Sequence, residues 1–306
     1  MFRAGAAFRE TKSAAEIAPR TGRFVRAAGL AMFIQEAGPA GGDPVLFIHG
    51  TGAWSEMWRE QMTALAAIGF HCIALDLPPF GFSERPAEGR YGTTDQAARI
   101  LGVLEALRIE GAVLVGHSFG ARATVQAALS SPERVRALVL IDPALEIGSA
   151  KPESAIARTM LGVRPVREAL VSATAPNPLL TKKLLESLIR NRSAATPERV
   201  RMLQRPLVRA GTTREVALWL AGFLAPEPPS RSTAVASYEG IRIPVLLVWG
   251  SADEITPIDL GKRLAILIPG AELSVIPGAG HIPYIEDPVR TTEALRRFLA
   301  AHPRPR

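Results

Sequence analysis

Along this chain, short apolar runs alternate with longer amphipathic segments. Strands that are buried on both faces of a parallel sheet show such near-continuous apolar runs. The runs are Val45–Ile48, Ile73–Leu75, Val113–Val115, Leu138–Ile141, Val245–Trp249 and Leu273–Ile276. Segments with helical spacing lie between them, at 54–68, 93–108, 119–130, 258–267 and 287–301. This alternation predicts an α/β fold with a doubly wound, mostly parallel sheet.

The alternation is interrupted between about residues 149 and 240. This block shows helical spacing, for example at Leu179–Ile189, but contains no apolar run typical of a buried strand. We therefore expect a helical cap at 149–240, inserted into a core formed by 24–148 and 241–306.

The start of the chain has a different character. Residues 1–23 contain no apolar stretch long enough for a signal peptide, and we expect them to form a flexible N-terminal extension. Phe24–Arg26 and Leu30–Glu36 are flanked by glycines and predict an antiparallel hairpin at the sheet edge. Because no apolar run approaches 18 residues, we expect no membrane insertion and a cytoplasmic protein.

The composition and motifs of the chain exclude several kinds of chemical site. Of 306 residues, 47% are hydrophobic and 21% charged, as in ordinary globular proteins. The single cysteine, Cys72, lies in an apolar run, which predicts a buried thiol and excludes a disulfide framework. The sequence has no phosphate-binding loop, dinucleotide fingerprint or metal-ligand cluster, so we expect neither a cofactor nor a metal.

The net charge of +7 is unevenly distributed. The block 149–240 holds 14 Lys and Arg against 7 Asp and Glu, which accounts for the whole excess. The excess indicates either solvated helix faces or attraction of anionic substrates or a lipid surface. No basic stripe is interleaved with aromatic residues, so nucleic acid is not an expected partner. A homo-oligomer remains possible from the sequence.

Chemically capable side chains follow several of the predicted strands. Ser118 follows the third run within Gly-His-Ser-Phe-Gly, Asp253 follows the fifth within GSADEITP, and His281 follows the last within GAGH. The ends of parallel strands meet at one edge of the sheet, where ligand sites form. A serine hydroxyl needs an adjacent base, and an aspartate can orient a histidine for that task.

These segments resemble the α/β-hydrolase family over residues 24–301. The motifs that carry the resemblance are HGTG, DLPPFGFSERP, GHSFG, GSADEITP and GAGH, and the order Ser118, Asp253, His281 also matches. The resemblance implies a nucleophile elbow at Ser118 and a Ser-His-Asp triad. Backbone N–H groups of Phe119 and, by resemblance, Thr51 would form the oxyanion hole.

Other titratable residues near strand ends are assigned different roles. His117 points away from its neighbour Ser118 in an extended segment, and His49 is expected to brace the His-Gly loop. Asp142, which precedes a proline, is a second candidate acid but is better explained as a turn or cap residue. Trp54 and Trp58 fit either the core or a pocket.

The leading prediction is a serine carboxylesterase that acts on a small-molecule ester through an acyl-enzyme. An alternative is hydrolysis of a carbon–carbon bond in a diketone-type substrate, which the same triad and a cap would serve. A third hypothesis is a ligand-binding receptor or accessory protein on this fold. The cap at 149–240 is expected to set specificity in each case.

Overall fold

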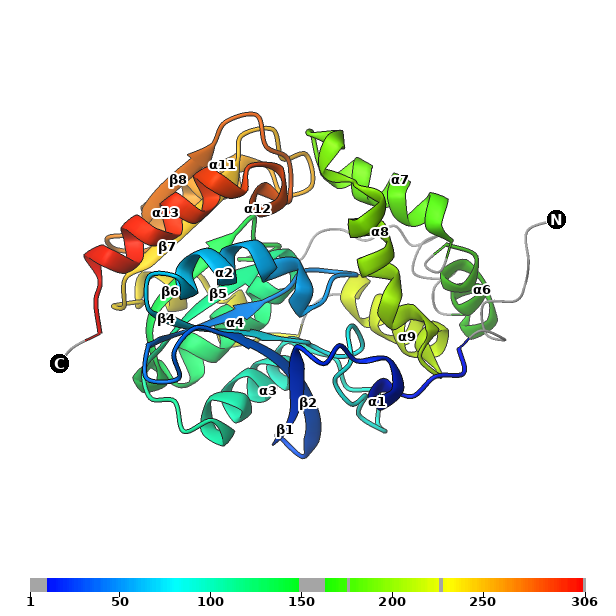
Figure 1. Ribbon diagram of the computed structural model, residues 1–306. Coiled ribbons are helices and arrows are strands. Elements are labelled where there is room, and N and C mark those ends of the chain that lie inside the picture. Colours follow the sequence, from blue (N-terminus) through cyan, green and yellow to red (C-terminus); the bar gives the residue numbers. More distant parts are fainter. Residues whose placement is uncertain (1–9, 149–162, 175–176, 226–227, 305–306) are drawn as a thin grey trace.

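The computed structural model describes residues 10–148, 163–174, 177–225 and 228–304, and its centre is an eight-stranded sheet (Figure 1). The strand order is β1-β2-β4-β3-β5-β6-β7-β8. β1 pairs with β2 and β2 with β4 in antiparallel fashion, and all other neighbours are parallel. The strands are β1 Gly22–Ala27, β2 Leu30–Ala37, β3 Asp43–Ile48, β4 Phe70–Leu75, β5 Ala112–His117, β6 Val135–Ile141, β7 Val245–Gly250 and β8 Glu272–Ile276. This confirms the mostly parallel sheet and its edge hairpin.

Helices cover both faces of the sheet, which makes it doubly wound. One face packs against α3 Thr93–Ala106, α4 Ser118–Ser130, α10 Val235–Glu239 and α11 Ile258–Leu267. The opposite face packs against α2 Arg59–Ala66 and α13 Pro288–Ala301. A short α12 Pro283–Glu286 leads into α13.

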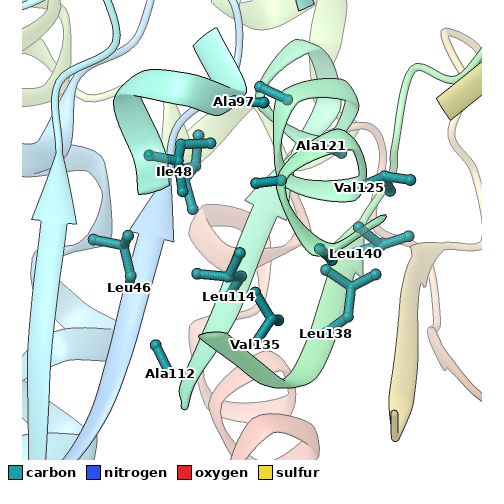
Figure 2. Packing of buried hydrophobic residues seen from close by; sticks show 14 of the residues in the cluster. Leu46, Ile48, Ala97, Ala112, Leu114, Ala121, Val125, Val135, Leu138 and Leu140 are labelled. Atoms are coloured by element: carbon teal, nitrogen blue, oxygen red, sulfur yellow. The ribbon is translucent and has the colours of Figure 1, made fainter. Parts of the chain in front are cut away.

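Strand β5 shows why the apolar runs lack polar interruptions. Successive side chains on a strand point to opposite faces of the sheet. Ala112 and Leu114 accordingly join one core cluster, whereas Val113 and Val115 join the other. Figure 2 shows Leu114 beneath helix α4 in the first cluster. Because both layers are apolar, every position on the strand is buried.

Among the described residues between β6 and β7, α6 Arg164–Thr174, α7 Pro178–Leu188, α8 Pro197–Gln204 and α9 Thr212–Leu224 lie on one side of the sheet in Figure 1, whereas α10 packs on the core. The side chains of Asn177 and Thr196 cap α7 and α8, and a proline follows each cap, as is common at helix starts. Part of the predicted cap, 149–162, lies outside the described residues. None of the described helices, here or in the core, is long and apolar enough to cross a membrane.

The described part of the N-terminal segment differs from the flexible extension that the sequence predicts. Lys12 exchanges backbone hydrogen bonds with the insertion, through the carbonyl of Val208 at 3.2 Å and the N–H of Ala210 at 2.9 Å. Glu10 accepts two backbone hydrogen bonds from Thr213 N–H at 3.0 Å. A capping box around Ser13 starts helix α1 Ala14–Ile17. These contacts fix residues 10–17 against α9 and its preceding turn.

Three residues that the sequence leaves open or predicts as buried belong to the core. Cys72 is fully buried, and this burial raises the pKa of its thiol to about 12. Trp58 stacks on Tyr284 with ring centroids 4.1 Å apart. Trp54 packs edge-to-face on Phe82 and donates its indole N–H to a carbonyl of the insertion at 2.9 Å. Neither tryptophan is more than 1% exposed, so both are structural.

Candidate active site

Ser118 lies at the sharp turn between β5 and α4. Its φ of 49° falls in the left-handed region, which is unfavourable for a residue with a Cβ. Crowding explains the glycines on either side: a Cβ at Gly116 would lie 2.4 Å from Thr124 Oγ1, and one at Gly120 only 2.3 Å from the His49 carbonyl oxygen. The backbone is therefore strained at the one position that presents a hydroxyl at the sheet edge.

The structure brings Ser118, His281 and Asp253 together. Nε2 of His281 is 2.8 Å from Ser118 Oγ, and Nδ1 of the same ring is 2.8 Å from Asp253 Oδ2. With its proton on Nδ1, His281 donates to Asp253 and accepts from the Ser118 hydroxyl. None of the three is more than 7% exposed. This arrangement has the connectivity of a Ser-His-Asp triad.

Asp253 is held as a carboxylate by a dense set of donors. Its Oδ1 accepts from the N–H groups of Ile255 at 2.7 Å and Thr256 at 3.1 Å, and its Oδ2 accepts from the Thr256 hydroxyl at 2.7 Å. Burial alone would raise the pKa of Asp253, but the hydrogen bond and charge of His281, with the Thr256 hydroxyl, lower that pKa to about 2. Thr256 is a site residue that the sequence analysis missed, although its position three residues after Asp253 is typical of a side-chain-capped turn.

Two other histidines near the site are neutral and structural. Nε2 of His117 donates to the His281 carbonyl at 2.8 Å, and its Nδ1 accepts from the Tyr284 hydroxyl at 3.2 Å. His49 accepts from the Leu77 N–H at 2.9 Å, which braces the His-Gly loop as expected. Burial lowers the pKa of His49 to about 4 and that of His117 to about 3. His117 is thus bonded to the His281 backbone and not to Ser118.

The His-Gly loop closely approaches the serine. A Cβ on Gly50 would lie 3.2 Å from the Ser118 Cβ and 2.4 Å from His117 Nδ1, so only glycine fits there. Thr51 follows Gly50, and Phe119 occupies the first turn of α4, where backbone N–H groups have no intrahelical acceptor. The two residues predicted to supply the oxyanion donors thus directly follow Gly50 and Ser118 in the chain.

Glu286 connects the His281 loop to the insertion and was also missed. Its Oε2 accepts from the N–H groups of Arg190 at 2.6 Å and Asn191 at 2.9 Å. Its Oε1 accepts from Gly280 N–H at 2.9 Å, next to His281. In addition, the His281 N–H donates to a carbonyl at the end of α7 at 2.8 Å. One buried carboxylate therefore fixes the loop of the histidine against the base of the cap.

An aromatic cluster from both parts of the chain lies beside the serine. Phe119, which follows Ser118, contacts Trp219 of α9 with ring centroids 5.2 Å apart, and Phe223 stacks on Trp219 at 4.8 Å. Phe80 completes the cluster from the core. The cap therefore contributes aromatic side chains that pack against the residue following Ser118.

Asp142 is not the turn or cap residue that the sequence predicts. It follows β6 directly, is 0% exposed, and its φ of 39° lies in the left-handed region. Its Oδ1 accepts from the Gly250 N–H at 3.0 Å. Asp142, Asp253 and His281 each place a polar atom within a group spanning 4.8 Å. The strand register explains this, because β6 and β7 are neighbours and end at the same edge.

The geometry of the elbow and the sheet agrees with a comparison to known families. The family described as alpha/beta hydrolase fold matches residues 43–288. The chain belongs to the α/β-hydrolase family. Its fold, with the serine between β5 and α4, and its triad-like arrangement make it a serine hydrolase of this family.

Several relatives resemble this α/β hydrolase along nearly its whole length. A 2-hydroxymuconate semialdehyde hydrolase of a Pseudomonas species is 32% identical over 94% of this chain and 97% of the relative. A 2-hydroxy-6-oxo-2,4-heptadienoate hydrolase of Pseudomonas putida is 29% identical over 92% and 96%.

Two solved structures give the same picture. A meta-cleavage product hydrolase from Pseudomonas fluorescens superimposes with a TM-score of 0.75 at 25% identity, covering 92% of this chain and 98% of that one. A thermophilic esterase from Thermogutta terrifontis gives a TM-score of 0.74 at 25% identity, covering 94% and 100%. The α/β hydrolase is thus similar both to enzymes named for meta-cleavage products and to an esterase.

Proposed function

We propose that this hydrolase cleaves a carbon–carbon bond next to a ketone in a diketone-type substrate, with Ser118 as nucleophile, His281 as base and Asp253 as its acid partner. The observation that carries the proposal is the continuous hydrogen-bonded chain from Ser118 Oγ through His281 to Asp253, each step 2.8 Å long. A serine hydroxyl is a weak nucleophile, and this chain supplies the base that activates it.

In the first half of the reaction, Ser118 Oγ adds to the substrate carbonyl as its proton passes to His281 Nε2. Asp253 stabilises the imidazolium that forms, because its low pKa keeps it charged. The oxygen that becomes negative would accept hydrogen bonds from the N–H groups of Thr51 and Phe119. Such donors act where charge develops, in a site shielded from water.

In the second half, the carbon–carbon bond breaks and its electron pair leaves as a carbanion. A second carbonyl in conjugation delocalises that pair, which is why a diketone-type substrate suits this route. His281 returns its proton to the leaving carbon, and the acyl group stays on Ser118. Water, activated by His281, then hydrolyses the acyl-enzyme to a carboxylic acid and free Ser118.

The choice of this bond over an ester rests on the relatives. Two relatives similar over more than nine-tenths of this chain are named as hydrolases of 2-hydroxymuconate semialdehyde and of 2-hydroxy-6-oxo-2,4-heptadienoate. This supports the carbon–carbon alternative better than the carboxylesterase prediction. The aromatic cluster of Phe80, Phe119, Trp219 and Phe223 offers apolar surface for the acyl part.

A carboxylate on the substrate would fit the charge of the cap. A cavity of about 300 Å³ lies between the end of α7 and the loops of Asp253 and His281, and both Arg190 and Arg192 line it. Glu186 and Glu254 line the same cavity and Arg190 pairs with Glu254, so we expect only a weak attraction for that carboxylate.

Ester hydrolysis is the second candidate, because an esterase of similar fold aligns over the full length of its own chain. The test is the steady-state kcat/KM of purified protein for a 2-hydroxy-6-oxo-dienoate and for p-nitrophenyl acetate. We expect the dienoate to be preferred, and Ser118→Ala to abolish turnover of both. Turnover of the ester with no dienoate cleavage would overturn the carbon–carbon proposal.

The receptor hypothesis is addressed by the same assay. A dedicated receptor would bind the dienoate and form less than one molecule of product per protein molecule before the dienoate dissociates. Multiple turnovers that depend on Ser118 are expected. Binding of the dienoate without turnover by the unmodified protein would favour the receptor.

A further inference from the structure

Asp142 is a buried carboxyl group that the proposed mechanism does not use. Its Oδ1 accepts from the Gly250 N–H at 3.0 Å. Its Oδ2 is shielded from solvent and has no N–H or hydroxyl donor among the residues that the structure describes. A buried carboxylate oxygen without a donor is unfavourable, so the protonation state of this group needs an explanation.

The side chain of Asp253 supplies that explanation. A carboxyl oxygen of Asp142, a carboxyl oxygen of Asp253 and a ring nitrogen of His281 all lie within 4.8 Å of one another. Two carboxylates repel each other at such a distance, and a hydrogen bond between them requires one proton. Asp253 already accepts from Ile255, Thr256 and His281, whereas Asp142 has one backbone donor. The proton therefore belongs on Asp142.

The charges around Asp142 favour the same assignment. Burial, followed by the charge of Asp253, raises the pKa of Asp142 well above its ordinary value, and the Glu286 carboxylate adds to this rise. His281 is the cationic partner available when protonated, and it bonds to Asp253. The Thr256 hydroxyl donates to the backbone carbonyl of Asp142 at 3.3 Å, and not to the Asp142 carboxyl group.

We propose that Asp142 is a positioning residue, a neutral carboxylic acid whose Oδ2–H donates to the Asp253 carboxylate and holds it against His281. The inference rests on the proposed triad. Because Asp142 keeps its proton, the two acids together carry one negative charge. This charge matches the single positive charge that forms on His281. Asp142 and Ser118 both have a φ in the left-handed region, a strained conformation that clusters at functional sites.

Two substitutions separate a proton donor from a carboxylate. In Asp142→Asn, the amide oxygen can accept from Gly250 while the NH₂ donates to Asp253, so the hydrogen bonds survive. Asp142→Ala removes both. We expect the rate of p-nitrophenyl acetate acylation to stay within about threefold of the unmodified protein for Asn. For Ala we expect a loss of about ten- to a hundredfold, the scale of a lost hydrogen bond to a charged group.

A second measurement needs no substrate and therefore survives failure of the proposed function. A carboxyl group whose pKa is raised on folding makes the folded protein less stable as pH rises above the unfolded pKa of about 4. A neutral amide at the same position has no such effect. The Tm of Asp142→Asn minus that of the unmodified protein should thus grow from pH 4 to pH 8. Asp259→Asn, at an exposed position on α11, is the matched control and should show no such trend.

The outcomes are distinct. A Tm difference that is flat or shrinks with pH would mean that Asp142 is ionised in the folded protein, which overturns the inference. An acylation loss in Asp142→Asn as large as that in Asp142→Ala would overturn it as well. If the unmodified protein is not acylated at all, the triad proposal fails, whereas the Tm comparison still reports on the proton.

Discussion

The core and the inserted helices contribute to the site in different ways. Ser118, Asp253 and His281 follow strands that end at one sheet edge, so hydrogen-bonded register fixes where they lie. Trp219 and Arg190 come from the insertion and reach the site through side-chain packing and the Glu286 contacts. The triad-like residues are thus placed by the backbone register of the sheet, whereas the residues of the insertion are placed by contacts between segments far apart in the chain.

The largest expected effect is in the core. Asp253→Asn should lower kcat by roughly 10⁴-fold, because the amide cannot stabilise the His281 cation or its tautomer. Steady-state kinetics at pH 7 measures this, with the structure of the variant checked by circular dichroism. A loss below tenfold would mean that another acid, such as Asp142, serves His281.

The free energy of unfolding should depend on pH because Asp253 titrates. Since the pKa of Asp253 is lowered to about 2, its charge contributes stability that is present above pH 4 and is lost as pH falls through 2. The shift corresponds to about 2 kcal/mol. Urea unfolding of the unmodified protein and of Asp253→Asn between pH 2 and 7 should show the two curves converge in acid.

A pair of glycines tests how tightly each region is packed. Gly120→Ala in the core places a Cβ 2.3 Å from the His49 carbonyl oxygen, whereas Gly222→Ala in α9 meets nothing within 4 Å. We expect the first to destabilise by about 1–3 kcal/mol. The second should stabilise by up to about 1 kcal/mol, since alanine favours helix. Equal effects in urea unfolding would contradict the contrast.

Trp219→Leu should change selectivity more than chemistry. Replacing the indole with a smaller side chain opens space in the aromatic cluster that contains Phe119. The kcat/KM ratio of a long to a short p-nitrophenyl acyl ester should therefore rise by about tenfold, the scale of one or two buried methylenes. Phe298→Leu, buried on the far face of the core, is the control. It should lower Tm and leave the ratio unchanged. An unchanged ratio in Trp219→Leu would remove α9 from the acyl site.

The smallest effect concerns the charge of the cap. Arg190→Met should raise KM for a substrate with a carboxylate by no more than about fivefold, because the guanidinium is half exposed and already pairs with Glu254. KM for neutral p-nitrophenyl acetate should not change. A rise for both substrates would indicate a structural role at the Glu286 contact instead.

Much of the core could be predicted from the sequence because its strands are apolar on both faces. Val245–Trp249 and Ile258–Leu267 are examples in which an apolar run and its following helix coincide with β7 and α11. The placement of Ser118, Asp253 and His281 follows from the same pattern, since residues that come directly after parallel strands of one sheet lie at the same edge.

The remaining features of the fold and the site depend on tertiary contacts that produce no periodic pattern in the sequence. Asp142 reads as a turn residue because a single Asp-Pro after a strand carries no sign of the carboxyl opposite it. The role of Glu286 cannot be predicted from the sequence either, since two of its four N–H donors, Arg190 and Asn191, lie about 95 residues away in the chain. The order of residues 10–17 cannot be predicted from the sequence, because their partners at Val208 and Thr213 are about 200 residues away.

The most direct test of the account is covalent labelling of the serine. The protein is incubated with a fluorophosphonate probe, digested, and mapped by mass spectrometry, alongside Ser118→Ala and Asp253→Asn. We predict a single adduct on the peptide that contains Ser118, absent from Ser118→Ala and formed far more slowly in Asp253→Asn. No adduct on the unmodified protein, or one that persists in Ser118→Ala, would contradict the account.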